Sequence, residues 1–228
     1  MIVEAFFRLK TVLLYQDELN LNRFVNMLFL FFVLLLFGFL FLVIIIFRIV
    51  EPAYMMIFNK PLYLYFYLFP KKLTTNQRQI LVNEFPFYKK LSDREKIYFE
   101  HRVKEFIDYY QFECKEELSV TDEMKIMISG VYTMLTFGMR DYLIDLFKTI
   151  IIYPSAYFSN ANQQYHKGEF NPIMKVVAFS LEDFVLGHKT TNDNINLGLH
   201  EFSHVLHFNC LKSDNPSEIF FLMNLMKL

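Results

Sequence analysis

The sequence predicts an α+β fold, mainly helical with a small sheet, that follows a single transmembrane helix. Three observations predict it: an apolar run over residues 27–47, capped helical periodicity after residue 91, and two β-branched runs near residues 150 and 177. Helices come first, then strands, then a last helix, and this segregated order is typical of α+β domains. A chain of 228 residues can hold one such domain with additions.

The apolar run reads "MLFLFFVLLLFGFLFLVIIIF", from Met27 to Phe47, and carries no charge. As a helix it would be roughly 30 Å long, enough to cross a bilayer. A signal peptide would start nearer the N-terminus and have a shorter apolar core. A buried core helix without a polar face would be unusual in so small a domain. We therefore expect a single-pass membrane protein that contacts the lipid bilayer through this segment.

The remaining chain divides around this helix. Residues 1–26 form an N-terminal arm, 27–49 the transmembrane helix, 50–72 a juxtamembrane connector and 73–228 the folded domain. The connector is rich in proline and tyrosine, which suits an irregular segment at a membrane interface. Lysine and arginine flank both ends of the apolar run, so the positive-inside rule leaves the orientation open.

Two helical stretches open the domain. Ser92 and Glu95 have the spacing of a capping box, and apolar residues recur at helical intervals behind them. A second stretch begins with a cap at residue 121 or 122. Gly130 and Gly138 interrupt that stretch, which leaves open whether it is one helix or two.

Two strands follow. "KTIIIYP" (148–154) is a β-branched run stopped by proline, and "MKVVAFS" (174–180) is a second apolar run. Between them we expect "QQYHKGEFN" to be a turn or loop. After them, "LEDFVLGHKTTNDN" is interpreted as a polar connection to the last helix.

Charge and cysteine content exclude some classes of function. The formal net charge is −1, so no general field would attract nucleic acid, and we expect no nucleic-acid partner. Cys114 and Cys210 lie far apart and form neither a disulfide framework nor a paired metal knuckle. Both are expected to be free thiols.

The chemistry-bearing motif is "LHEFSHVLHFN", residues 199–209. Residues four apart share one helix face, so His200 and His204 can bind one zinc ion. Glu201 would then be the general base for a zinc-bound water, the H-E-x-x-H arrangement of zinc metalloproteases. The alternative is a surface helix that happens to carry two histidines. The apolar residues around the motif favour a packed helix, in which such polar residues need a partner.

The other histidines fit less well. His207 lies on the same helix face as His200 but about 10 Å further along the axis. Three imidazoles on one unbroken helix cannot easily converge on a tetrahedral ion, so His207 is interpreted as a residue that supports the metal ligands from outside the coordination sphere or that has a structural role. His166 and His188 stand in polar segments and are expected to be solvated.

Three segments carry a family resemblance: "MLTFGMRDYLIDLFKTIIIYPSAYFS", "HKGEFN" and "VVAFSLEDFVLGHKTTNDNINLGLHEFSHVL". They resemble the zinc-dependent peptidases related to Mlc titration factor A, over most of residues 85–210. The resemblance implies a gluzincin-like fold, peptidase or aminopeptidase activity on a peptide or protein substrate, and zinc as the cofactor. It makes His200 and His204 the zinc ligands and Glu201 the catalytic base. It also makes "VVAFS" the strand whose edge captures substrate, and some members bind a transcriptional repressor of sugar uptake.

Two departures from the family remain. The founding member is soluble, which implies a cytoplasmic catalytic domain here but does not explain the apolar run. Family members carry a glutamate ligand on a later helix, whereas Asp214 and Glu218 follow the motif too closely to match it. We therefore expect the C-terminal part of the domain to be missing. Two functions stay open: a membrane-anchored zinc metallopeptidase, or a catalytically incomplete binding protein that captures a partner such as a transcriptional regulator.

Overall fold

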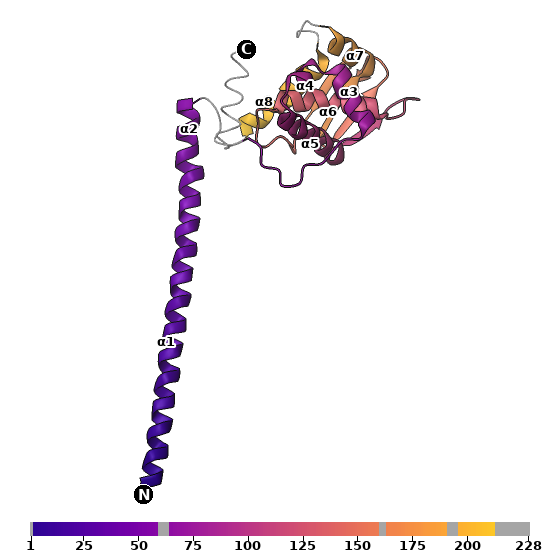
Figure 1. Cartoon of the computed structure of the whole chain (residues 1–228). Coiled ribbons are helices and arrows are strands. Elements are labelled where there is room, and N and C mark those ends of the chain that lie inside the picture. Colours follow the sequence, from indigo (N-terminus) through magenta and orange to yellow (C-terminus); the bar gives the residue numbers. More distant parts are fainter. Residues whose placement is uncertain (1, 59–63, 160–162, 191–195, 213–228) are drawn as a thin grey trace. The chain divides into compact units, whose positions relative to one another are not determined.

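The computed structural model describes residues 2–58, 64–159, 163–190 and 196–212. The chain divides into two compact units, residues 1–60 and 61–228, and each is described by itself (Figure 1).

The first unit is one long helix. Helix α1 (Ile2–Ile45) continues through a π-helical turn (Ile46–Val50) into α2 (Glu51–Phe58). Pro52 explains the wider turn, because proline cannot donate to the preceding turn and its ring clashes with the carbonyl four residues earlier. The predicted helix is confirmed. The arm belongs to the same helix, and the connector begins as helix rather than as an irregular segment.

One stretch of this unit, Glu18–Tyr54, is long and apolar enough to cross a membrane, and none of its most apolar window is buried. This finding rests on length and composition alone. A signal sequence or a core helix passes the same test, so the crossing itself stays a prediction.

The second unit contains the remaining described helices. These are α3 (Thr75–Glu84), α4 (Pro86–Lys90), α5 (Asp93–Tyr109), α6 (Asp122–Thr136), α7 (Leu181–Lys189) and α8 (Leu197–Lys212). The predicted capping box is present, since the Ser92 backbone N–H donates to Glu95 at 2.9 Å and Ser92 Oγ accepts in return. Thr121 caps α6, which runs through Gly130 as one helix. A Cβ on Gly130 would lie 2.4 Å from Phe85 Cζ, so only glycine allows that approach.

The strands form a four-stranded sheet and a separate two-stranded hairpin. The sheet has the order β1 (Gln111–Cys114), β2 (Thr149–Tyr153), β6 (Val176–Ser180) and β5 (Gly168–Asn171). The first three strands are parallel, and β5 pairs with β6 antiparallel. The hairpin pairs β3 (Tyr157–Ser159) with β4 (Gln164–His166). This mixture of helices and a small sheet confirms the predicted α+β class.

Three sequence interpretations are wrong. "QQYHKGEFN" is not a loop but contains β4 and β5, whose polar residues reflect strands at an edge rather than in the core. The supposed polar connection is α7, which Ser180 caps by accepting from the Asp183 backbone N–H at 3.2 Å. "VVAFS" is β6, and both its edges are already paired. The edge strands of the sheet are β1 and β5, and β5 is the one that lies beside α8.

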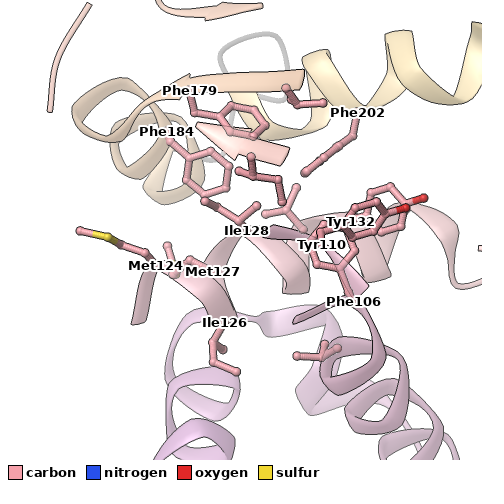
Figure 2. Packing of buried hydrophobic residues seen from close by; sticks show 14 of the residues in the cluster. Phe106, Tyr110, Met124, Ile126, Met127, Ile128, Tyr132, Phe179, Phe184 and Phe202 are labelled. Carbon is pink, nitrogen blue, oxygen red and sulfur yellow. The ribbon is translucent and has the colours of Figure 1, made fainter. Parts of the chain in front are cut away.

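The core lies between the sheet and the helices. Ile150, Ile152, Val177 and Phe179 all point to the helical face and are fully buried. Phe202 of α8 packs edge-on against Phe179 and Tyr132, with ring centroids 5.4 and 5.0 Å apart (Figure 2). Burying one such ring stabilises the fold by about 2–3 kcal/mol. The packing therefore fixes α8, and with it the histidine motif, against the β5 end of the sheet.

Candidate metal centre

Helix α8 presents the motif as predicted. The Asn196 side chain caps its start by accepting from the Leu199 backbone N–H at 3.0 Å. Phe202, Val205 and Leu206 are fully buried on the core side. His200 and His204, four residues apart, lie on the exposed side of the same helix.

The two histidines are arranged as a pair of metal ligands. Their Nε2 atoms lie 3.2 Å apart, and the ring planes are nearly perpendicular at 87°. Two nitrogens bound to one tetrahedral zinc ion are separated by roughly 3.3 Å. Partial burial, then the charges of His200 and His207, lower the pKa of His204. A lower pKa favours the neutral imidazole that a metal requires. The pair therefore fits two positions of a zinc site.

Glu201 is a buried carboxyl beside this pair, with only 7% of the residue exposed. Burial, and next the charge of Glu169, raise the pKa of Glu201 to about 7. The charge of His166 and a backbone hydrogen bond from Phe170 act in the opposite direction. A carboxyl with a pKa near neutrality is suited to accept and release a proton.

Gly168 allows Glu201 to lie against β5. A Cβ at Gly168 would come within 2.8 Å of Glu201 Cγ and Oε1, and of Leu197 Cδ1. Any other residue would push α8 or the carboxyl away, since real side chains do not approach so closely. The glycine thus sets the distance between the strand and the motif.

The free edge of β5 faces this carboxyl. The Ser180 backbone N–H donates to the Lys167 carbonyl at 2.6 Å, which marks that pair as hydrogen-bonded. Antiparallel pairs alternate, so Gly168 and Phe170 turn their peptide groups away from β6. The hydrogen bond between Phe170 and Glu201 agrees with this direction. The sequence analysis missed this edge; the glycine within "HKGEFN" was the available signal.

Two polar groups near Glu201 were also missed. Tyr157 Oη and His166 Nε2 are buried and lack a hydrogen-bond partner in the part of the chain that the structure describes. The expectation that His166 is solvated is therefore wrong. It is also wrong for His188, whose Nε2 lies 3.0 Å from the Glu84 carbonyl oxygen and serves packing. Periodicity could not find Tyr157 or His166, because a three-residue strand is too short to show it.

The structure brings the two predicted metal ligands, His200 and His204, together, and its described residues supply no third. Within residues 2–58, 64–159, 163–190 and 196–212, no three side chains of His, Cys, Asp or Glu are grouped to hold a metal. His207 is exposed further along α8. Asp214 and Glu218 lie outside the described residues.

Comparison with known proteins agrees with this site. A family model described as glucose-regulated metallo-peptidase M90 matches residues 67–215, which include all the strands described above and the motif helix. No curated protein matches the chain. The match covers well over half of the sequence, and the chain therefore belongs to the glucose-regulated metallo-peptidase M90 family.

Proposed function

We propose that this protein is a membrane-anchored zinc metallopeptidase that hydrolyses peptide bonds. One observation carries the proposal: two imidazole nitrogens 3.2 Å apart adjoin a buried carboxyl of raised pKa on the same helix. A free strand edge beside that carboxyl offers a place for an extended peptide.

The residues divide the work by position. His200 and His204 would hold zinc, which when bound supplies a Lewis acid for the peptide carbonyl and acidifies a water. Glu201 takes the proton of the attacking water and delivers it to the leaving nitrogen. The outward groups of Gly168 and the outward carbonyl of Phe170 hydrogen-bond the substrate backbone, which aligns the scissile bond with Glu201. The reaction takes place at the face of α8 that lies beside β5.

The apolar helix would anchor this domain to a bilayer. Its most apolar window has a mean hydropathy of 3.4 and no buried side chain, which fits lipid as its surroundings. We place the catalytic domain in the cytoplasm, because the founding member of the family that the sequence resembles is soluble.

A second function is favoured by the two-ligand set. With two histidines alone zinc would be held weakly, and the domain would capture a protein partner, such as a transcriptional regulator, without cleaving it. The described residues supply no third ligand, which is the observation behind this alternative.

One experiment separates the two. The full chain in lipid nanodiscs is incubated with zinc, its metal content is measured, and a peptide mixture is analysed by mass spectrometry. A peptidase binds about one zinc per chain and yields defined fragments. His200→Ala and His204→Ala lose metal, whereas His207→Ala, the matched control on the same helix, retains it. Metal bound but no fragment from any peptide points to the binding role. If the chain binds no metal and cleaves no peptide, the peptidase proposal is refuted.

A further inference from the structure

A hollow of about 220 Å³ lies on the sheet face opposite the helical core. Its floor comes from Ile151, Ala178 and Glu169, which stand side by side in register on β2, β6 and β5. Its apolar walls include Tyr153, Tyr157, Phe158, Met174 and Val176. The volume is sufficient for one long side chain or the first residue of a peptide.

Glu169 is the acidic residue in this lining. Its charge raises the pKa of Glu201 and also that of Tyr157, so it lies within electrostatic reach of both. Among the described residues, no ion pair joins Glu169 to a cation. A carboxylate among apolar walls favours a cationic guest, because a charge-assisted hydrogen bond is strong there.

Tyr157 supplies a second, independent sign of a ligand. The residue is only 8% exposed, and its ring stacks on Tyr153 with centroids 4.0 Å apart. Its hydroxyl is buried and, in the described part of the chain, makes no hydrogen bond. A buried hydroxyl without a partner is destabilising, and a hydrogen bond to a guest in the hollow would offset this.

The strand geometry connects this hollow to the site. A peptide that pairs with the outward groups of Gly168 and the outward carbonyl of Phe170 has one residue opposite Glu169. Side chains of paired residues project from the same face, about 5 Å apart. That residue of the substrate therefore extends over the hollow, next to the bond on which Glu201 acts.

We propose that Glu169 and Tyr157 recognise a cationic nitrogen of the substrate, with its carbon stem against Phe158 and Met174. The nitrogen is either the α-ammonium of the peptide or the side-chain cation of lysine or arginine. This proposal rests on the proposed peptidase function and names the determinant of its substrate preference.

The test uses the full chain with zinc and four matched fluorogenic peptides. These carry lysine or norleucine in the first position, each with a free or an acetylated amino terminus. In one of the two pairs, wild type is expected to prefer the peptide that carries the recognised cation by roughly 30-fold in kcat/KM. This factor corresponds to one hydrogen bond to a charged group. Glu169→Gln should narrow that ratio to about 3-fold or less. A preference for lysine over norleucine means that the side-chain cation is recognised. A preference for the free over the acetylated amino terminus means that the α-ammonium is recognised.

Glu113→Gln is the matched control, because Glu113 lies in register with Ile151 on the same sheet face but on the far edge strand. It should keep the wild-type ratio. Tyr157→Phe keeps the ring and should narrow the ratio through KM. Equal cleavage of all four peptides by wild type, or an unchanged ratio in Glu169→Gln, overturns the proposal.

Binding of the same peptides to zinc-loaded Glu201→Gln, by fluorescence anisotropy, gives the ratio without catalysis. If wild type cuts nothing while this binding ratio is present and depends on Glu169, the peptidase function fails and the recognition stands. If wild type cuts but neither ratio depends on Glu169, the recognition fails alone.

Discussion

Arg102 and Glu201 are both buried ionisable side chains, but their surroundings differ: those of Arg102 stabilise its charge, and those of Glu201 oppose it. Arg102 is completely buried, yet its guanidinium donates to Tyr67 Oη at 2.7 Å and to the carbonyls of Thr136 and Met139 at 2.9 and 2.8 Å. Every side of the charge meets an acceptor or an aromatic ring. Such a residue holds the connector to α5 and α6, and nothing is left over for a ligand.

Glu201 is almost as deeply buried, but its surroundings oppose its charge. A second carboxylate, Glu169, is near it, and the charge of His166 and a backbone hydrogen bond from Phe170 offset these effects only in part. The result is a pKa of about 7 rather than the ordinary 4.5. A buried charge with a full set of partners indicates a structural role, whereas one that is poorly compensated beside a free strand edge indicates a chemical role.

The largest expected effect is on catalysis at Glu201. Glu201→Gln should lower kcat by roughly 10³-fold, because the proton acceptor is gone. The melting temperature should stay equal or rise, because a neutral amide costs less to bury than a carboxylate. Peptide cleavage and thermal unfolding of the same sample measure both. A variant that is both fully active and less stable would contradict the contrast.

Arg102 should show the reverse. Arg102→Met removes the donor to three acceptors and should lower the free energy of unfolding by about 3–5 kcal/mol, with little change in kcat for the folded fraction. Arg94→Met is the control, since Arg94 is exposed on the same helix and should change stability by under about 0.5 kcal/mol. Denaturant titration measures both. If both variants lose the same free energy of unfolding, the loss reflects replacement of arginine on α5 in general and not the three acceptors of Arg102.

This contrast also marks what the sequence could predict. The caps at Ser92 and Thr121 and the four-residue histidine spacing are local patterns, and the structure confirms all three. The acceptors of Arg102 lie 34 to 37 positions away, so no window of sequence links them. The edge strand beside Glu201 was missed for a different reason: its run is only four residues, too short to show a strand period.

Two glycines give the next sharpest comparison. Gly168→Ala would place Cβ 2.8 Å from Glu201 Oε1 and should lower kcat/KM by about 10- to 100-fold, because a shift near 1 Å misplaces the base. Gly130→Ala would meet Phe85 in the core and should cost about 1–3 kcal/mol of stability instead. Kinetics corrected for the folded fraction distinguish them. If Gly168→Ala loses only stability, the glycine serves packing alone.

The smallest effect concerns His101, next to Arg102. Burial lowers the pKa of His101 below its ordinary 6.5; the charge of Glu105 opposes this, and those of Lys71 and Arg102 add to it. The neutral ring fits the structure, since Nδ1 accepts from the Lys71 backbone N–H at 3.0 Å.

Because the folded state disfavours the charged ring, this contribution to stability is complete above pH 6.5 and is lost as the pH falls below it. Melting temperatures between pH 8 and pH 5 should fall less steeply in His101→Gln, whose amide oxygen can still accept from Lys71. Parallel slopes in the two proteins would mean that the connector tolerates a charged ring. Arg102 would then be the one residue tested in this region whose charge state the fold depends on. The contrast between a structural and a chemical role would rest on Arg102 and Glu201 alone.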